Sequence, residues 1–310
     1  MKIKSNNINN IEKYFLELQD SICSIINKTE SKLFKVDDWK KSSESKLSGS
    51  GRTRIIENGS LIERGGVNYS HVFGDKLPPT ATSQRPELVG RSFEALGISL
   101  VFHPKNPYIP TVHMNIRYFI AHASSKYESD IWWFGGGMDL TPYYIFEEDA
   151  KHFHFTCKEA LDPFSKKYYP DFKKKCDEYF YIKHRMETRG IGGIFFDDFS
   201  DLGFDKSFSM IRAVGNSFSK AYFPIVDLRK NTHFGDRERN FQFYRRSRYV
   251  EFNLVYDRGT IFGLQSGGRI ESILMSMPPR VSWIYNYSPE KGSKEEKLYE
   301  FLKPIDWLKV

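Results

Sequence analysis

The stretch GISLVFHPKNPYIPTVHMNIRYFIA, residues 97–121, contains two runs in which apolar side chains alternate with polar or small ones. Successive side chains of a β-strand point to opposite faces, so this period predicts two strands that each have one polar face. These faces consist of Ser99, Val101 and His103 in the first run and of His113, Asn115 and Arg117 in the second. A polar face is either solvated or the floor of a site, and the pattern leaves both interpretations open.

Length and composition indicate an ordinary globular chain that is rich in aromatic rings. Its 310 residues suffice for one large domain or two ordinary ones. Aromatic residues make up 16%, which favours a core or cavity built of rings. The net charge of +7 and the pI near 9.0 are compatible with nucleic acid, an acidic membrane or an anionic small molecule. Arginines gather among aromatic residues in 237–258, which makes them better ligand candidates than the lysines.

Cysteine usage and the N-terminal sequence predict a cytoplasmic protein. Cys23, Cys157 and Cys176 show no CxxC spacing, which indicates a reducing compartment. No apolar run approaches the roughly 18 residues that a membrane helix requires. The start, MKIKSNNINNIEKYF, lacks the apolar core of a signal peptide and carries an acidic residue early for a transit peptide.

The N-terminal region is predicted to be a helical arm over residues 1–40 of a single α+β unit that spans 1–310. Residues 41–51 form a Ser/Gly-rich break, and the turn signals at 58–59 and 65–66 suggest short strands beyond it. Apolar residues recur at helical spacing over 8–35. The stripe consists of Ile11, Phe15, Leu18, Ile22, Ile25 and Ile26.

Two further segments with helical periodicity carry histidines. In residues 146–164 the spacing places His154 at the edge of the apolar stripe, whereas His152 points to water. In residues 171–190 it places His184 on the buried face of the last turns. A glycine at position 190 then suits the cap that ends the helix.

Two glycine-containing segments predict turns. The alternation in residues 249–256, followed by Asp257-Arg258-Gly259, predicts a hairpin whose second strand runs towards Gly267-Gly268. The segment WWFGGGMDLTPYY, 132–144, predicts a glycine turn that lets the backbone approach another group closely, with Asp139 directly after it. The alternative for Asp139 is a helix cap before a proline.

Four histidines point inward by these local arguments: His103, His113, His154 and His184. Each could be a satisfied core residue. None shows the i, i+4 spacing of HExxH or another compact metal signature, so the spacing leaves open whether they hold a metal. The inventory favours one class of ligand, a large apolar molecule that carries several carboxylates. It combines aromatic residues for the walls of a cavity, arginines whose guanidinium groups match carboxylates, and few candidate nucleophiles.

Five segments closely resemble the oxygen-dependent coproporphyrinogen III oxidases of bacterial type, in that family's order, from about residue 50 to the C-terminus. They are GGVNYSHVFG, GISLVFHPKNPYIPTVHMNIRYF, WWFGGGMDLTPYYIFEEDAKHFH, YFYIKHRMETRGIGGIFFDD and RYVEFNLVYDRGTIFGLQSGGRIESILMSMPP. The resemblance implies a large, flat antiparallel sheet flanked by helices on both faces. It also implies a homodimer that forms through about residues 249–284.

The implied activity is oxidative decarboxylation in haem biosynthesis. Such enzymes convert the propionates on rings A and B of coproporphyrinogen III into vinyl groups and so produce protoporphyrinogen IX. Molecular oxygen accepts the electrons, and carbon dioxide and hydrogen peroxide are released. No organic cofactor is implied, because the substrate is itself electron-rich. A divalent metal such as manganese is implied for some members only.

The resemblance also implies roles for individual residues. Substrate contacts fall on Ser99, on Asn115, Ile116 and Arg117, and on Gly267, Gly268 and Arg269. His113 matches the proton donor, and Asp139 with Arg258 matches the pair that holds the pyrrole nitrogens. The four inward histidines match the metal ligands. Lys175 and Ser247 depart from the family pattern, in which tryptophan and glycine are usual.

Two other classes of protein remain as alternatives. A histidine-ligated metal oxygenase or hydrolase would require stoichiometric metal. A basic nucleic-acid binder would be explained by the net charge and by the clusters of arginine with aromatic residues. We expect no nucleic-acid partner, and any binding to polynucleotide to be weak and sensitive to salt.

Overall fold

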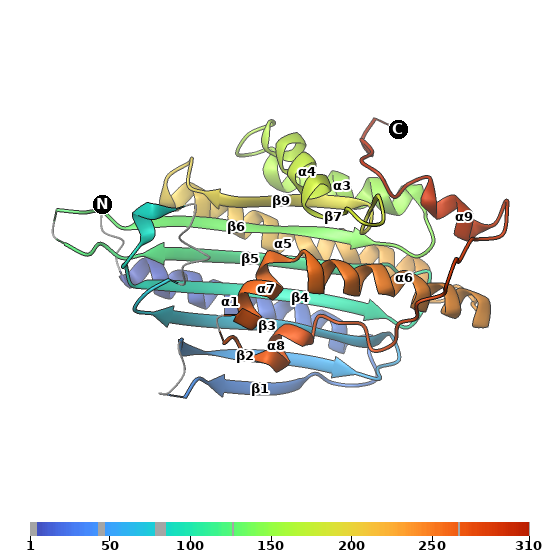
Figure 1. Cartoon of the computed structure of the whole chain (residues 1–310), viewed down its shortest axis with the longest axis horizontal. Coiled ribbons are helices and arrows are strands. Elements are labelled where there is room, and N and C mark those ends of the chain that lie inside the picture. Colours follow the sequence, from blue (N-terminus) through green and yellow to red (C-terminus); the bar gives the residue numbers. More distant parts are fainter. Residues whose placement is uncertain (1–4, 43–46, 78–84, 126, 266, 310) are drawn as a thin grey trace.

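A computed structural model describes residues 5–42, 47–77, 85–125, 127–265 and 267–309. Its centre is a sheet of seven strands in the order β1-β2-β3-β4-β5-β6-β9, with every neighbouring pair antiparallel (Figure 1). The predicted α+β fold with a large antiparallel sheet is therefore confirmed. The strands are β1 (Lys35–Lys40), β2 (Ser48–Glu57), β3 (Ile62–Gly74), β4 (Phe93–Pro104), β5 (Thr111–Ala121), β6 (Ile131–Thr141) and β9 (Gly192–Phe199).

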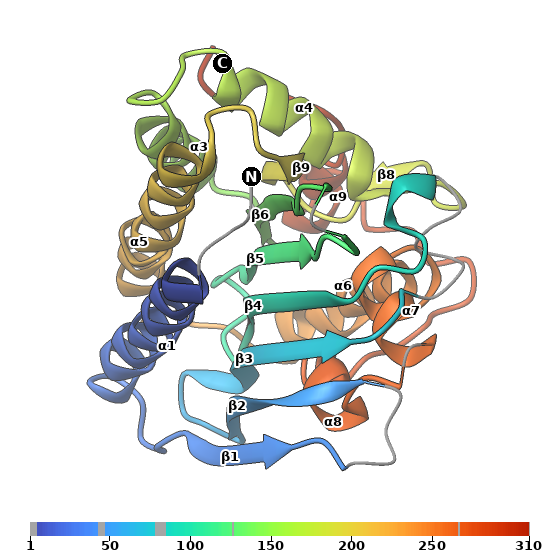
Figure 2. The ribbon, with the colours of Figure 1, turned by 90° about the vertical axis from the view of Figure 1, so that its left-hand side faces the viewer.

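Helices cover both faces of this sheet. Figure 2 shows the sheet edge-on, with α1, α3 and α5 on one side and α6, α7 and α8 on the other. The helices are α1 (Ser5–Asn27), α3 (Glu147–Leu161), α4 (Tyr168–Tyr179), α5 (Phe204–Arg229), α6 (Asp236–Val255), α7 (Arg258–Gln265), α8 (Ile270–Leu274) and α9 (Lys294–Tyr299). A short 3₁₀ turn (Pro86–Leu88) and a small ribbon of β7 (Tyr181–Ile182) with β8 (Glu187–Thr188) complete the fold.

The main core lies between the sheet and the layer of α1, α3 and α5. The predicted alternation of β4 and β5 is confirmed, since Leu100, Phe102, Met114 and Ile116 all point into this core and are fully buried. The opposite, polar face of the same strands is turned towards α7 and α8. One face of the sheet therefore supplies stability through apolar burial, while the other is available for a site.

The predicted N-terminal helix is confirmed but is shorter than expected. Its stripe is buried at Ile11, Phe15, Leu18, Ile22 and Ile26 and packs against β3 and β4. The helix ends at Asn27, because the chain then turns to form β1 at the edge of the sheet. The predicted break at 41–51 lies in the β1–β2 connection, of which residues 43–46 fall outside the described residues, and β2 has already begun at position 48.

The hairpin predicted for 249–267 is wrong, because this segment forms the end of α6 and the whole of α7. Three arginines of α6 explain the error, since Arg245, Arg246 and Arg248 are all buried. Their forks reach carboxylates of the body of the protein; Arg246 Nη1 is 2.8 Å from Glu63 and Arg245 Nη2 is 2.9 Å from Glu187. A pattern of apolar positions cannot reveal a helix whose buried side contains charges. Because these arginines are buried, they are not available to bind a polynucleotide.

The helix predicted for 171–190 ends at Tyr179, so His184 does not lie on a buried helical row. It lies instead in the turn between β7 and β8, and its side chain is 41% exposed. Glu251 of α6 accepts hydrogen bonds from His184 and Arg185, which holds this turn against α6 rather than in line with α4. Gly190 therefore caps no helix.

Two of the predicted glycine turns are also wrong. Gly65-Gly66 lies inside β3, and Gly135-Gly136-Gly137 lies inside β6, whereas Asn58 does adopt the left-handed conformation of a turn. The expected close approach of backbone is nevertheless present. A Cβ on Gly137 would lie 2.1 Å from the carbonyl oxygen of Ile194 on β9. Glycine in β6 therefore allows a close pairing with β9 rather than a change of chain direction.

We expect Gly137→Ala to lower the free energy of unfolding by at least about 3 kcal/mol, because β6 and β9 must separate to make room for the methyl group. Gly97→Ala is the matched control on the same sheet. Its new methyl would meet neighbours only at 3.5 Å, an ordinary contact distance. Urea unfolding of both variants measures the difference, and equal stability of the two would contradict this account of the glycine run.

Candidate active site

A cavity of about 570 Å³ lies on the polar face of the sheet, beneath α7 and α8. The two polar rows predicted from the sequence form part of its floor, with Ser99 and Val101 on β4 and with His113, Asn115 and Arg117 on β5. Aromatic rings from β5, β6, α4 and β9 form much of the wall. These rows therefore line a cavity rather than a fully solvated face, except for His103, which is not among the lining residues.

His113 is held by a buried carboxylate on the neighbouring strand. Its Nδ1 lies 2.8 Å from Oδ1 of Asp139, which is the residue directly opposite on β6. Arg189 approaches the same carboxylate with Nη2, at 2.8 Å from Oδ2 and 3.0 Å from Oδ1. The side chains of Asp139 and Arg189 are each only 2% exposed. Burial alone would raise the pKa of Asp139, but the charge of Arg189 and the hydrogen bond from His113 outweigh it and lower that pKa.

This arrangement determines the tautomer of His113. An ionised carboxylate only accepts hydrogen bonds, so Nδ1 of His113 carries a proton and donates it to Asp139. The other ring nitrogen, Nε2, forms no hydrogen bond to the residues that the structure describes. Because His113 lines the cavity, Nε2 is the atom that can exchange a proton with a bound molecule.

Aromatic rings enclose Arg189. Its guanidinium carbon lies 4.1 Å from the ring centroid of Phe180, 4.4 Å from that of Tyr249 and 4.9 Å from that of Phe252. Nη1 donates to Oδ1 of Asn253 at 2.8 Å. Stacking on rings and an ion pair offset the cost of burying this charge. Helical spacing predicts Arg189 only as a basic residue at a helix C-terminus, and no local pattern marks its buried ion pair, since its partners come from β6, from α6 and from the residue that follows α4.

The predicted pair of Asp139 and Arg258 is not brought together. Asp139 is buried behind His113, whereas Arg258 lies at the rim of the cavity with a side chain that is 66% exposed. Arg258 rests over the rings of Tyr179 and Phe195, at 5.1 Å and 5.9 Å from their centroids. The two residues therefore act at different depths of the site.

Three carboxylates without a predicted role line the cavity, namely those of Asp197, Asp198 and Asp257. Asp197 on β9 pairs with Arg117 at 2.8 Å. Asp257 precedes Arg258 and accepts from Tyr179 Oη at 2.8 Å and from the backbone of α7. The run FFDDF did contain a signal for Asp197, because period-two alternation places it on the same face as Phe195.

The remaining predicted substrate contacts lie outside the cavity. Ile116 points to the opposite face of β5 and is fully buried in the core. Gly267, Gly268 and Arg269 do not line the cavity. Arg269 instead forms an ion pair with Asp37 of the edge strand β1 at 2.6 Å. The sequence order of these residues could not reveal that their loop packs on that edge.

Two of the predicted metal ligands are satisfied core histidines. His103 Nε2 donates to the carbonyl of Ser276 at 2.8 Å and its Nδ1 lies 3.0 Å from the hydroxyl of Thr111. His154 Nε2 donates to the carbonyl of Ile191 and its Nδ1 accepts from Tyr169, both at 3.0 Å. Burial lowers the pKa of both rings, and that of His154 lies at about 3.

The four histidines do not fit a common metal site. His184 is engaged at both ring nitrogens, with Tyr256 at 2.8 Å and Glu251 at 2.7 Å. The carboxylate of Asp139 holds the ring of His113 through Nδ1. Within the described ranges, no three His, Cys, Asp or Glu side chains converge to hold a metal ion. The sequence-based expectation of a shared site therefore disagrees with the geometry.

The two departures from the family pattern lie away from the cavity lining. Lys175 on α4 extends over the ring of Phe172, 5.7 Å from its centroid. Ser247 is buried in α6, where its hydroxyl donates to the carbonyl of Tyr244 at 2.6 Å and accepts from Arg248 at 2.8 Å. Both residues have local packing partners.

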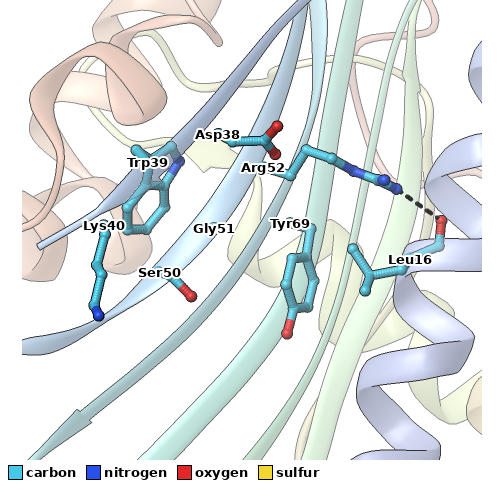
Figure 3. A pocket seen from close by; sticks show the side chains of 8 residues that line it. All are labelled: Leu16, Asp38, Trp39, Lys40, Ser50, Gly51, Arg52 and Tyr69. Atoms are coloured by element: carbon cyan, nitrogen blue, oxygen red, sulfur yellow. Dashed lines mark hydrogen bonds between the residues drawn. The ribbon is translucent and has the colours of Figure 1, made fainter.

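A second hollow of about 430 Å³ lies between α1 and the edge of the sheet, near Trp39 and Tyr69 (Figure 3). Arg52 lines this hollow, and its guanidinium donates to the carbonyl of Leu16 at 3.2 Å and to Asp20 at 2.8 Å. That charge therefore joins α1 to the sheet. The cavity around His113 is the better candidate for the active site.

Residues 10–307 match the family described as coproporphyrinogen III oxidase. This range includes the whole of the cavity lining. Among the residues that the structure describes, no helix has the length and apolar character needed to cross a bilayer.

We expect the stability of the protein to fall between pH 6.5 and pH 4.5, partly because His154 stays neutral when folded. Its pKa is about 3 in the folded state, while an unperturbed histidine titrates near 6.5, so only the unfolded state takes up a proton in this range. The free energy of unfolding then falls by about 1.4 kcal/mol per pH unit for this group.

The variant His154→Gln removes this contribution. Urea unfolding at several pH values should therefore give a shallower decline for the variant than for the wild type. Two parallel curves would show that His154 is not buried and neutral as described.

Proposed function

The chain belongs to the coproporphyrinogen III oxidase family, and from this premise we propose oxygen-dependent decarboxylation of the propionates on rings A and B. The family makes the protein an oxidoreductase of porphyrin biosynthesis with coproporphyrinogen III as its substrate. The observation that carries the finer proposal is the ring-walled cavity whose floor presents His113 and Arg117. It combines apolar walls for a tetrapyrrole with guanidinium groups for its acid side chains.

The proposed reaction balances without an organic cofactor. Each propionate, in its ionised form, loses carbon dioxide, one proton and two electrons, and leaves a vinyl group. One molecule of oxygen takes up the two electrons, this proton and a second proton from solvent, and becomes hydrogen peroxide. The protein must therefore hold the propionate, accept a proton and keep water away from the reacting ring. Anchoring and proton transfer are tasks for side chains.

We assign the proton transfer to His113 rather than to Asp139. Nε2 of His113 is available to the cavity, and Asp139 keeps the ring in the tautomer that presents this lone pair. Once His113 has accepted a proton, the carboxylate stabilises the imidazolium. Asp139 thus acts through His113 as a positioning residue, and Arg189 keeps it ionised.

Arg117 and Arg258 are the proposed anchors for the propionates. Arg117 is fixed by Asn115, whose Oδ1 accepts from Nη1 at 2.8 Å. Arg258 approaches from the roof, at the first turn of α7. A guanidinium on the floor and another on the roof can grip two acid side chains of one substrate and so determine which ring meets oxygen.

Further proposals rest on the resemblance. A homodimer through about residues 249–284 is supported by exposed apolar side chains in this region, among them Leu254, Ile270, Trp283 and Ile284. A cytoplasmic location stays a prediction. A divalent metal does not suit the histidines named for it, and no step above passes through one.

We expect the purified protein to consume oxygen when supplied with coproporphyrinogen III and to yield protoporphyrin fluorescence after oxidation of the product. Without oxygen the same mixture should give no product, because nothing else is provided to accept the electrons. Oxygen-electrode traces and fluorescence emission measure both quantities. Equal product formation with and without oxygen would refute the oxygen dependence.

We expect Asp139→Asn to lower kcat by a factor of 10² to 10⁴, because an amide no longer holds His113 in the required tautomer. His113→Ala should cost at least as much, and the double variant little more, since the two residues act as one unit. Circular dichroism checks that the variants fold. The matched control is Asp227→Asn, on exposed α5 surface beside Lys230, and it should keep the wild-type rate.

A further inference from the structure

One carboxylate lies between the two arginines of the cavity. Asp197 Oδ1 is 2.8 Å from Nη2 of Arg117, and its Oδ2 is 3.7 Å from Nη2 of Arg258. Arg117 belongs to the floor strand β5, Asp197 to β9, and Arg258 begins α7 in the roof. The protein's own carboxylate therefore occupies the space between the groups to which an acid side chain of a ligand would bind.

The backbone is arranged to place Asp197 there. The β6–β9 register shifts between Phe134 and Gly136, and Asp198 has a φ of 52°. This irregularity lets β9 return Phe199 to the core after Asp197 has pointed into the cavity. A Cβ on Gly135 would lie 2.8 Å from both Arg117 and Asp197 Oδ1, so a larger residue there would displace the two side chains of the ion pair.

The other charges of the cavity wall have partners already. Arg189 is neutralised by Asp139, Asp198 faces Arg85 at 3.1 Å, and Asp257 accepts hydrogen bonds from Tyr179 and Thr260. Among the described lining residues, Arg117 and Arg258 are thus the guanidiniums left for ligand carboxylates, and both share Asp197. A further carboxylate of the ligand that Arg117 and Arg258 cannot reach would lie close to the negative charge of Asp197.

We propose that Asp197 is a specificity-determining residue, which limits the number of carboxylates that a bound tetrapyrrole can carry. This inference rests on the proposed function and deepens it. A ligand with four propionates can place acid groups at Arg117 and Arg258 and point the others outward. A ligand with acetate in place of each ring methyl brings further carboxylates against Asp197, and like charges brought together lower its affinity.

The test measures equilibrium binding of two fluorescent porphyrins at 0.15 M salt. One is coproporphyrin III, with four carboxylates, and the other is the octacarboxylic porphyrin with acetate in place of each methyl. Wild-type protein should prefer the tetracarboxylic ligand. In Asp197→Asn the amide oxygen still accepts from Arg117, but the charge is gone, so the preference should fall by about tenfold.

Two variants control for other effects of the substitution. Asp227→Asn makes the same change of net charge on α5, on the far face of the sheet, and should leave the preference within twofold of wild type. Asp197→Glu keeps the charge and should keep the preference. If Asp197→Asn kept the wild-type preference, the inference would be overturned. The same holds if the affinities for both porphyrins fell by the same factor, because Asp197 would then serve only to hold Arg117.

The same measurement separates this inference from the proposed function. Binding of coproporphyrin III with an unchanged preference in Asp197→Asn removes only the role of Asp197. Absence of binding of either porphyrin to the wild type overturns both.

Discussion

The buried ion pair between Asp139 and Arg189 is the interaction on which the site depends. Two charges removed from water are stable only when each finds a partner, and the loss of one partner typically costs 3–5 kcal/mol. Here the carboxylate also accepts from His113, and the guanidinium is enclosed by the rings of Phe180, Tyr249 and Phe252. A single pair thus joins β6 and β5 to the segment before β9 and to α6.

The sheet provides the second constraint, because it separates stability from chemistry. The face beneath α1 and α5 is packed with apolar side chains, so the opposite face can hold polar groups at low cost to the fold. Glycine in β6 brings β9 close, which sets Asp197 beside Arg117. Strand register therefore sets the floor of the cavity, while α7 and α8 form its roof.

Arginine performs three different tasks in this protein. Arg245 and Arg246 fix α6 to the body through buried carboxylates, while Arg189 keeps Asp139 ionised. Arg117 and Arg258 face the cavity. Composition alone cannot distinguish these tasks, because the same planar fork serves a structural carboxylate and a ligand carboxylate equally well.

The sequence by itself determined the local faces. The period of two in β4 and β5 predicted the side chains that share the cavity floor except His103, which is buried outside the lining. The period of 3.6 predicted α1 and the inward position of His154. Both periods follow from backbone geometry, which each segment carries alone. Only the tertiary structure decided that Asp139 holds the ring of His113 and that Arg189 neutralises Asp139. It also decided that His184 lies on another surface. Partners of a buried charge come from distant segments, and no local period encodes their meeting.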